Sequence, residues 1–369
     1  IKLSGSVFGK LFIVSTWGES HGKALGVVVD GCPAGISITE EYIQKELDRR
    51  KPGSNPYGTK RNESDEVHIL SGVFEGKTTG TPISMIVYNQ DHHSTDYNEI
   101  AQYYRPGHAD YTFDKKYGIH DYRGGGRSSG RETLCRVAAG AIAKKMLHHL
   151  DIDLFAYTTS IGNITISENR FDRNAISQNK LYMPDMVAAE QAENYLKQCM
   201  QEQDSAGGVI ECVISHMPVG IGETVFYKLP AVLGQALFSI GAVKGLEFGE
   251  GFAVSKLKGS QNNDAFYIDE NGSIQKKTNH SGGILGGMSD GSPIVFRLAF
   301  KPTPSIYQTQ QTVTKNGENI HINIKGRHDP IIVPRAVVVV ESMAAIALVD
   351  LLFQNMVCNI NHIINFYKH

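Results

Sequence analysis

Runs of apolar residues, and the polar residues that bound them, predict the first elements of the chain. Ala24–Asp30 is almost entirely apolar, which is typical of a buried strand. A helix is expected to begin after Thr39, because threonine is a suitable N-cap and two glutamates follow in the first turn. Ile43 and Leu47 form an apolar i,i+4 pair on this helix, and Lys51–Gly53 contains the proline and glycine that end it.

The next elements are predicted in the same way. Residues 51–66 are polar and are expected to form a mobile loop, which strands at about 67–74 and 82–88 follow. A segment rich in glycine, histidine and arginine covers about 90–130. It ends in an alanine-rich helix from about Glu132 to Leu150, with basic residues near its C-terminus, as the helix dipole favours.

Three patterns from the first half of the chain recur in the same order in the second half. The matched pairs are residues 20–36 with 205–221, residues 80–83 with 291–294, and the alanine-rich helices that follow Arg131 and Arg335. We therefore expect one α+β domain over residues 1–369, built from two related α/β halves at roughly 1–185 and 186–369. A site made of loops from both halves is expected near the pseudo-symmetry axis.

Composition narrows the classes of function. The 369 residues are 41% hydrophobic, which is enough to bury a large core. The net charge of -2 argues against a general nucleic-acid-binding protein, because no global positive field attracts a polyanion. No apolar run approaches a membrane span and no signal segment is evident, so we expect a soluble cytoplasmic protein without a membrane partner. The 5 cysteines are odd in number and far apart, which fits reduced thiols rather than disulfides or a zinc site.

The segment 121–136 combines glycines, hydroxyl groups and arginines ahead of a predicted helix. Its glycines allow the backbone to approach a ligand, and Ser128 or Ser129 can cap the helix. The free N–H groups at the helix start would then face an anion. Arg127 and Arg131 add bidentate donors for phosphate or carboxylate. The alternative is a glycine loop followed by solvated arginines.

Two histidines stand in glycine-bearing turns, His21 and His108. Imidazole is the side chain best matched to proton transfer near neutral pH, so both are candidate general acids. The alternative is that both are ordinary polar residues of surface turns without a catalytic role. His92 and His93 lie near His108 in the sequence, but the three lack a carboxylate or cysteine partner at metal-ligand spacing, so no metal site is predicted.

Three further segments are candidates for ligand contacts. Asp329 follows an arginine and a histidine and precedes a proline, so it suits either a tuned proton acceptor or a plain turn. Gly282–Gly287 resembles a flat backbone shelf, and Lys301–Ser305 resembles a loop lined by hydroxyl groups. Such segments suit a planar cofactor with a phosphate tail, or they are simply turns.

Taken together, five motifs in this chain resemble the chorismate synthase family. They are Gly18–Gly22, Arg105–Asp110, Arg127–Thr133, Gly282–Gly287 and Gly326–Pro330. They follow the family order from about residue 5 to 355 without a large insertion. The resemblance implies a β-α-β layered sandwich and a lyase that makes chorismate, on the shikimate pathway of aromatic amino acid biosynthesis. The implied reaction is the 1,4-anti elimination of phosphate from 5-enolpyruvylshikimate 3-phosphate, with reduced FMN (FMNH2) as cofactor.

The resemblance also implies a role for each matching residue. His21 would be the general acid at the leaving phosphate, His108 would protonate the reduced flavin, and Asp329 would assist deprotonation on the flavin N5 side. The implied substrate-binding residues are Ser20, Arg50, Arg105, Arg131 and Arg327. The implied FMN-binding residues are Arg127, Ser128, Ser129, Gly241, Ala242, Gly286, Lys301, Pro302, Thr303, Pro304, Ser305 and Arg327.

The chain departs from the family pattern at three positions. Pro56 stands where many members have an arginine, Gly241 replaces a more usual asparagine, and Pro304 replaces a serine. These differences bear on ligand affinity rather than on the class of reaction. No segment resembles a flavin reductase, so we do not expect this chain to reduce FMN with NADPH. We expect an external reductase to supply the reduced flavin. The family is usually homotetrameric, and the resemblance implies the same assembly here.

Two other classes of function fit the same basic loops. One is a different flavin- or nucleotide-dependent phosphatase or lyase that acts on another phosphorylated acid. The other is a non-catalytic binding protein for phosphorylated ligands or RNA. The binding protein gives no reason for His21, His108 and Asp329 to act together, and product analysis would separate the two enzymes.

Overall fold

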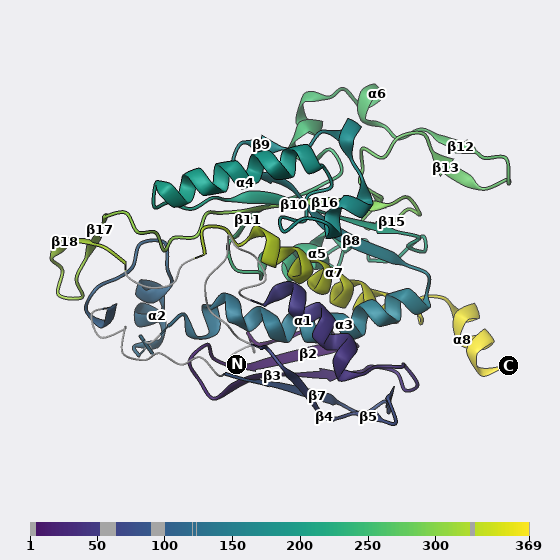
Figure 1. The fold of residues 1–369 in the computed structure, drawn as a ribbon. Helices are drawn as coiled ribbons and strands as arrows, with labels where there is room; N and C mark the ends of the chain where they lie inside the picture. The colour runs from purple at the N-terminus through teal and green to yellow at the C-terminus, as the bar shows by residue number, and fades with distance from the viewer. Residues whose placement is uncertain are drawn as a thin grey trace.

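Two antiparallel five-stranded sheets frame the molecule in the computed structural model, which describes residues 5–51, 64–89, 100–119, 121–122, 124–324 and 329–368 (Figure 1). The first sheet has the order β1-β2-β3-β7-β4, with bounds Val7–Phe8, Ile13–Gly18, Ala24–Asp30, Ile83–Tyr88 and Val67–Ser71. The second has the order β11-β16-β10-β8-β9, with bounds Val243–Phe248, Ile294–Phe300, Gly208–Ser215, Asp153–Ile161 and Ile164–Thr165. Strands such as β7 alternate buried and more exposed residues, so each sheet turns one apolar face inward.

Helices fill the space between the two sheets. This middle layer consists of α1 (Glu40–Arg50), α3 (Thr133–His149), α5 (Leu229–Phe238) and α7 (Val333–Asn355). A further helix, α4 (Met186–Gln201), covers the outer face of the second sheet (Figure 1). The predicted α+β class and the β-α-β layering are therefore confirmed.

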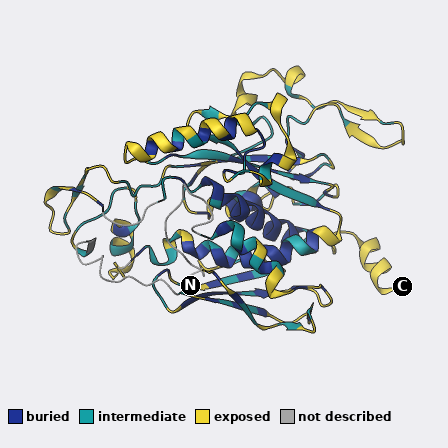
Figure 2. Cartoon of the chain, viewed as in Figure 1, coloured by how far each residue is buried: buried dark blue, intermediate teal, exposed yellow. Residues whose placement is uncertain are grey.

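The central helix is α7, which is apolar on all sides. Its mean hydropathy of 2.3 would suit a membrane span, but 89% of the apolar window is buried inside the fold. Figure 2 shows it as the most continuously buried helix of the molecule. A helix that is hydrophobic all round and enclosed by protein is a core helix.

The segments that share sequence patterns pair in a similar way within the two sheets. β3 lies beside β7 in the first sheet, and β10 lies beside β16 in the second. The helices α3 and α7 cross at close range, where a Cβ added to Gly140 would lie 2.2 Å from the Cβ of Ser342. The boundary near residue 185 stays a prediction; β8 and β9, which precede it, belong to the second sheet.

The first helix follows its local sequence signals closely. α1 begins after Thr39, whose Oγ1 accepts a hydrogen bond from the Tyr42 backbone N–H at 3.3 Å. Ile43 and Leu47 are buried against the core, and the helix ends before Lys51. The loop predicted over residues 51–66 lies mostly outside the described residues, including the departure at Pro56.

Three features differ from the predictions. A short helix, α2 (Asp110–Tyr117), interrupts the glycine- and histidine-rich segment, where no helix was predicted. The strand predicted at 67–74 is divided into β4 and β5 (Val73–Phe74) by Gly72, whose φ is +80°. The glycine shelf predicted at 282–287 is instead a hairpin of β14 (Ile284–Leu285) and β15 (Met288–Ser289), because Gly286 and its neighbour adopt positive φ in the turn.

The remaining elements are short and lie at the periphery. They are the strand pairs β5 with β6 (Lys77–Thr78), β12 (Phe266–Ile268) with β13 (Ile274–Lys276) and β17 (Gln310–Val313) with β18 (Asn319–Ile322), and the helices α6 (Gly259–Asn262) and α8 (Ile360–Tyr367).

Candidate active site

A cleft of about 580 Å³ opens where the N-terminal ends of α3 and α7 meet. Its walls come from both halves of the chain: the turn before α2 and the start of α3, and the loops that follow α5 and β16. The first turns of α7 supply an apolar wall with Ile332, Ala336 and Val339. A second hollow of about 370 Å³ adjoins it and shares the lining residues Ala109, Asp110, Gly125, Arg127 and Ser128. The cleft is thus lined by residues from distant parts of the chain, while the division into two related halves stays a prediction.

Positive charge dominates the lining of the cleft. The cationic side chains among the described lining residues are Arg50, Arg105, Arg127, Arg136, Lys301 and Arg335. The carboxylates are Asp110, Glu132 and Asp329. This imbalance, in a chain whose net charge is -2, fits a ligand that carries several negative charges.

Hydrogen bonds fix the tautomer of His108. Its Nδ1 lies 3.0 Å from the carbonyl oxygen of Pro106 and its Nε2 lies 2.9 Å from Oγ of Ser305. Because a carbonyl can only accept, Nδ1 carries the proton and Nε2 accepts from the serine hydroxyl. Burial, and next the charge of Arg105, lower the pKa of His108 to about 4, so the imidazole is neutral near pH 7.

The lowered pKa of His108 predicts how folding stability responds to acid. The pKa is about 4 in the folded protein against an ordinary value of 6.5, so the folded state resists protonation of this group. Its contribution is fully present above pH 6.5 and is lost as the pH falls toward 4. Over that window the wild type is expected to lose roughly 3 kcal/mol more unfolding free energy than His108→Gln. Urea unfolding at several pH values measures this difference, and parallel pH dependences would contradict it.

Asp329 is held at the cleft by an ion pair with the start of α7. Arg335 donates from Nη1 to its Oδ2 at 2.8 Å, and Thr303 donates from Oγ1 to its backbone oxygen at 2.6 Å. The Nε of the same arginine donates to the backbone oxygen of Arg50 at 3.1 Å. The carboxylate is therefore fixed between α7 and the end of α1.

Two arginines of the cleft are engaged by the protein itself. Arg105 makes a bidentate pair with Asp110, with both N···O distances 2.7 Å. Arg127 donates from Nη1 to the backbone oxygen of Gly18 at 3.0 Å and from Nη2 to Oγ1 of Thr16 at 2.6 Å. These bonds restrict how far each guanidinium can turn toward a ligand.

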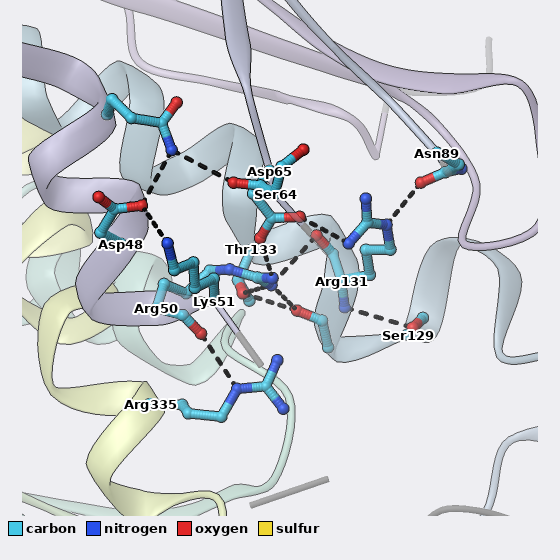
Figure 3. Close-up of polar contacts among 12 residues, drawn as sticks. Asp48, Arg50, Lys51, Ser64, Asp65, Asn89, Ser129, Arg131, Thr133 and Arg335 are labelled. Atoms are coloured by element: carbon cyan, nitrogen blue, oxygen red, sulfur yellow. Dashed lines mark hydrogen bonds and ion pairs between the residues drawn. The ribbon is translucent and has the colours of Figure 1, made fainter. Parts of the chain in front are cut away.

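A buried ion-pair network lies at the end of α1, beside the cleft (Figure 3). Asp65 accepts from Nη2 of Arg50 and from Nη1 of Arg131, each at 2.7 Å. Nη1 of Arg50 also donates to the backbone oxygen of Gly130 at 3.1 Å and to Oγ1 of Thr133 at 3.3 Å. Arg50 is thus a buried part of the wall, with only 1% of its side chain exposed.

The first predicted histidine sits beside the second hollow. Nδ1 of His21 lies 3.1 Å from Oγ of Ser20, and the ring lies against Gly124, where an added Cβ would come within 2.3 Å of Nδ1. Gly124 and Glu19 both line the second hollow. A glycine is required at 124 because any side chain there would displace the imidazole.

Comparison with known proteins identifies the fold and its relatives. The family model described as chorismate synthase matches residues 12–353. The chain belongs to the chorismate synthase family. It is 62% identical over 366 residues to a chorismate synthase of Lachnoclostridium phytofermentans, covering 99% of this chain and 100% of that protein. It is 51% identical over 349 residues to a chorismate synthase of Synechocystis sp., covering 94% of this chain and 96% of that protein.

A solved structure of the family has the same architecture. This crystal structure of a chorismate synthase matches with a TM-score of 0.77 at 29% sequence identity, covering 98% of this chain and 97% of that one. The two-sheet sandwich is therefore the chorismate synthase fold.

Most of the residues implied by the chorismate synthase motifs converge on the cleft. Those that line it are Arg50, Arg105, His108, Arg127, Ser128, Ser129, Gly241, Ala242, Lys301, Pro304 and Asp329. Thr303 and Ser305 lie directly behind this wall and bind the backbone of Asp329 and the ring of His108. The motifs thus bring together residues more than two hundred positions apart.

Other predicted site residues are not part of the cleft wall. Ser20 and His21 lie behind Gly124, and Arg131 is joined to Asp65. Pro302 is not among the lining residues, and Gly286 occupies the exposed turn of the β14–β15 hairpin. Arg327 lies outside the described residues.

Sequence reasoning missed several polar and charged residues in and around this cleft. They are Asp65, Asn89, Glu132, Arg136 and Arg335. The internal repeat offered one signal, because it matched the helices that follow Arg131 and Arg335. It could therefore have indicated Arg335 as a candidate site residue. No local pattern marked Asp65, which follows an ordinary polar stretch. Among the described residues, no group of three or more His, Cys, Asp or Glu side chains could hold a metal ion.

Proposed function

We propose that this chain converts 5-enolpyruvylshikimate 3-phosphate to chorismate by 1,4-anti elimination of phosphate, and that it requires reduced FMN. The observation that carries the proposal is the single cleft that combines an excess of cationic side chains with His108 and Asp329. The substrate has a phosphate and two carboxylates, so it needs several cationic partners. A binding protein would need the cations but not the two proton-transfer groups.

The residues at the cleft fit a flavin mononucleotide. A Cβ added at Gly241 would meet nothing within 4 Å, so the backbone there borders open space. Ala336 and Val339 give an apolar surface for a flat ring, and Ser128, Ser129 and Lys301 give donors for a phosphate. We infer that these residues hold FMN. When bound in its reduced form, FMN supplies electron density for cleavage of the C–O bond without net redox change.

The protein's own groups would move the protons. We assign His21 as the general acid at the leaving phosphate, and the adjoining hollow beside its turn supports that position. An anionic ligand in the cleft would raise the pKa of His108, so this imidazole would hold a proton only after the ligand binds. Asp329, fixed by Arg335, would accept a proton on the other side of the ligand.

An anaerobic assay tests the proposed function. Dithionite-reduced FMN and 5-enolpyruvylshikimate 3-phosphate are mixed with the protein, and chorismate and phosphate are followed against an oxidised-FMN control. Equal amounts of both products, formed only with reduced flavin, are expected. A folded protein that binds FMN but releases neither product would sink the proposal and favour another phosphorylated acid as substrate.

The supply of reduced flavin forms a separate part of the proposal. We infer a monofunctional cytoplasmic enzyme, assembled as a homotetramer, that depends on an external flavin reductase. In air, NADPH and oxidised FMN should then sustain no turnover until a reductase is added. Steady turnover by the pure protein under those conditions would show that it reduces its own flavin.

A further inference from the structure

Asp65 occupies an unusual position for an acidic residue. Its side chain has 0% relative exposure, and each carboxylate oxygen accepts from a different guanidinium, of Arg50 and of Arg131, at 2.7 Å. Its backbone has a φ of +48°, in the left-handed region that aspartate and asparagine adopt more readily than most residues other than glycine. A fully buried carboxylate is stable only when its surroundings pair its charge, as the two arginines do here.

The charge on Asp65 is needed to keep the two arginines together. Burial alone would raise the pKa of its carboxyl, but the charges of Arg50 and Arg131 outweigh burial and hold the pKa below its usual value. The carboxylate is therefore ionised near neutral pH and offsets one of the two positive charges. Without it, two guanidiniums would face each other in a site with little water to screen them.

One branch of the network leads into the cleft. Arg50 lines the cleft while 99% buried, and its Nε is a buried donor without a hydrogen-bond partner among the described residues. Buried N–H groups without a partner are uncommon and call for an acceptor. Because Nε is shielded from solvent while Arg50 lines the cleft, this arginine acts on an anion in the cleft through its positive charge.

The other branch leads to the turn that carries His21. Arg131 donates from Nε to Oδ1 of Asn89, and Nδ2 of Asn89 donates to the backbone oxygens of Glu19 at 3.0 Å and Gly22 at 2.8 Å. These two oxygens flank His21 in the chain. A continuous series of hydrogen bonds thus joins Asp65 to the histidine turn.

We propose that Asp65 is a positioning residue for the anion site of the cleft, acting through Arg50 on the bound phosphate or carboxylate and through Arg131 and Asn89 on the His21 turn. The identity of the anion rests on the proposed function. The position of Asp65 relative to the cleft rests on the contacts described above. It assigns Asp65 no direct contact with substrate.

The test begins with Asp65→Asn, because asparagine tolerates the left-handed backbone and nearly matches the shape of aspartate. The amide keeps an acceptor for one arginine but presents N–H groups to the other. In the anaerobic assay, KM for 5-enolpyruvylshikimate 3-phosphate is expected to rise about tenfold or more through the Arg50 branch, and kcat is expected to fall as well, because the turn that carries His21 loses its support. FMN binding, measured by fluorescence quenching, is expected to be unchanged. A KM equal to that of the wild type in a folded Asp65→Asn protein would overturn the proposal.

A double-mutant cycle shows whether Asp65 acts through its partner. Arg131→Met and the Asp65→Asn/Arg131→Met pair are compared with Asp65→Asn, and the double variant is expected to lose clearly less than the sum of the two single losses. The double variant also removes one charge of each sign, so it remains informative if Asp65→Asn alone fails to fold. Fully additive losses in kcat/KM would mean that Asp65 does not work through Arg131.

Asp185 supplies a matched control. It is also fully buried and paired with an arginine, Arg170, but it caps α4 on the outer face of the second sheet. Asp185→Asn is expected to lower thermal stability without changing KM. An equal rise of KM in both variants would show that the Asp65 effect is general destabilisation.

Inorganic phosphate separates this proposal from the proposed function. Phosphate is expected to raise the Tm of the wild type and to raise that of Asp65→Asn much less, whatever the protein's true substrate. A wild type that makes no chorismate but shows this difference refutes the proposed function and leaves the role of Asp65 intact. An equal phosphate shift in both proteins overturns the role of Asp65.

Discussion

Replacing His108 with alanine is expected to lower kcat by about a hundredfold or more, the usual cost of losing a proton-transfer group. The ring lies in the cleft wall with its Nδ1 proton bound to Pro106 and its Nε2 accepting from Ser305. His108 itself lines the cleft, so water can fill the space that the imidazole leaves, and the fold should survive. Single-turnover measurement of chorismate formation with reduced FMN isolates the chemical step from binding.

The control for His108 is His68→Ala. His68 is half-buried like His108, but it lies on β4, away from the cleft, where its ring packs near Tyr88. Its removal should leave kcat unchanged. If His108→Ala keeps full turnover and normal FMN affinity, the imidazole only fills the wall and the proton comes from elsewhere.

Elements whose signals are local were predictable from the sequence. α1 has its N-cap, its acidic first turn and its apolar pair within a dozen residues, so nearest neighbours decide its bounds. α3 was predicted from its alanine-rich run and its basic C-terminal end. The predicted cap by Ser128 or Ser129 is wrong for α3 itself, which has no side-chain cap, because Ser129 caps the short turn before it by accepting from the N–H of Arg131. Tertiary contacts refine such elements by a residue or two without changing them.

The missed helix α2 shows the limit of that reasoning. Its N-cap residue, Ala109, provides no side-chain cap, and Asp110 is its only buried residue. Gly118, in the left-handed conformation, does end it, but a glycine is common throughout this segment and so carried little information. A short polar helix without a cap or an apolar face gives almost no periodic signal.

The candidate site was predictable as a set of motifs but not as a network. The family motifs predicted His108, Lys301 and Asp329 as site residues, because each lies in a glycine- or proline-bearing loop with a recognisable pattern. Asp65 and Arg131 are 66 positions apart, and their pairing depends on how the segment before β4 packs against the turn before α3. Pairings set by packing leave no trace in one sequence, so the partners of the arginines had to come from the structure.

Replacing Asp329 with asparagine is expected to lower kcat about a hundredfold or more, with little change in substrate or FMN affinity. Asparagine keeps an oxygen that can accept from Nη1 of Arg335, and the Thr303 bond goes to the backbone, so the loop should keep its place. What the variant loses is a carboxylate that can take up a proton. Asp153→Asn, in the exposed pair with Arg173, is the control and should leave kcat unchanged.

Arg335→Met distinguishes proton transfer from simple bracing by the ion pair. That variant keeps the carboxylate of Asp329 but removes the 2.8 Å contact that fixes it and the bond to the backbone of Arg50. If Asp329 accepts the proton, Asp329→Asn should cost far more turnover than Arg335→Met, and Arg335→Lys should recover part of the latter loss. Equal losses in Asp329→Asn and Arg335→Met would mean that the pair matters only as a brace between α7 and α1, and the proton acceptor would have to be sought elsewhere in the cleft.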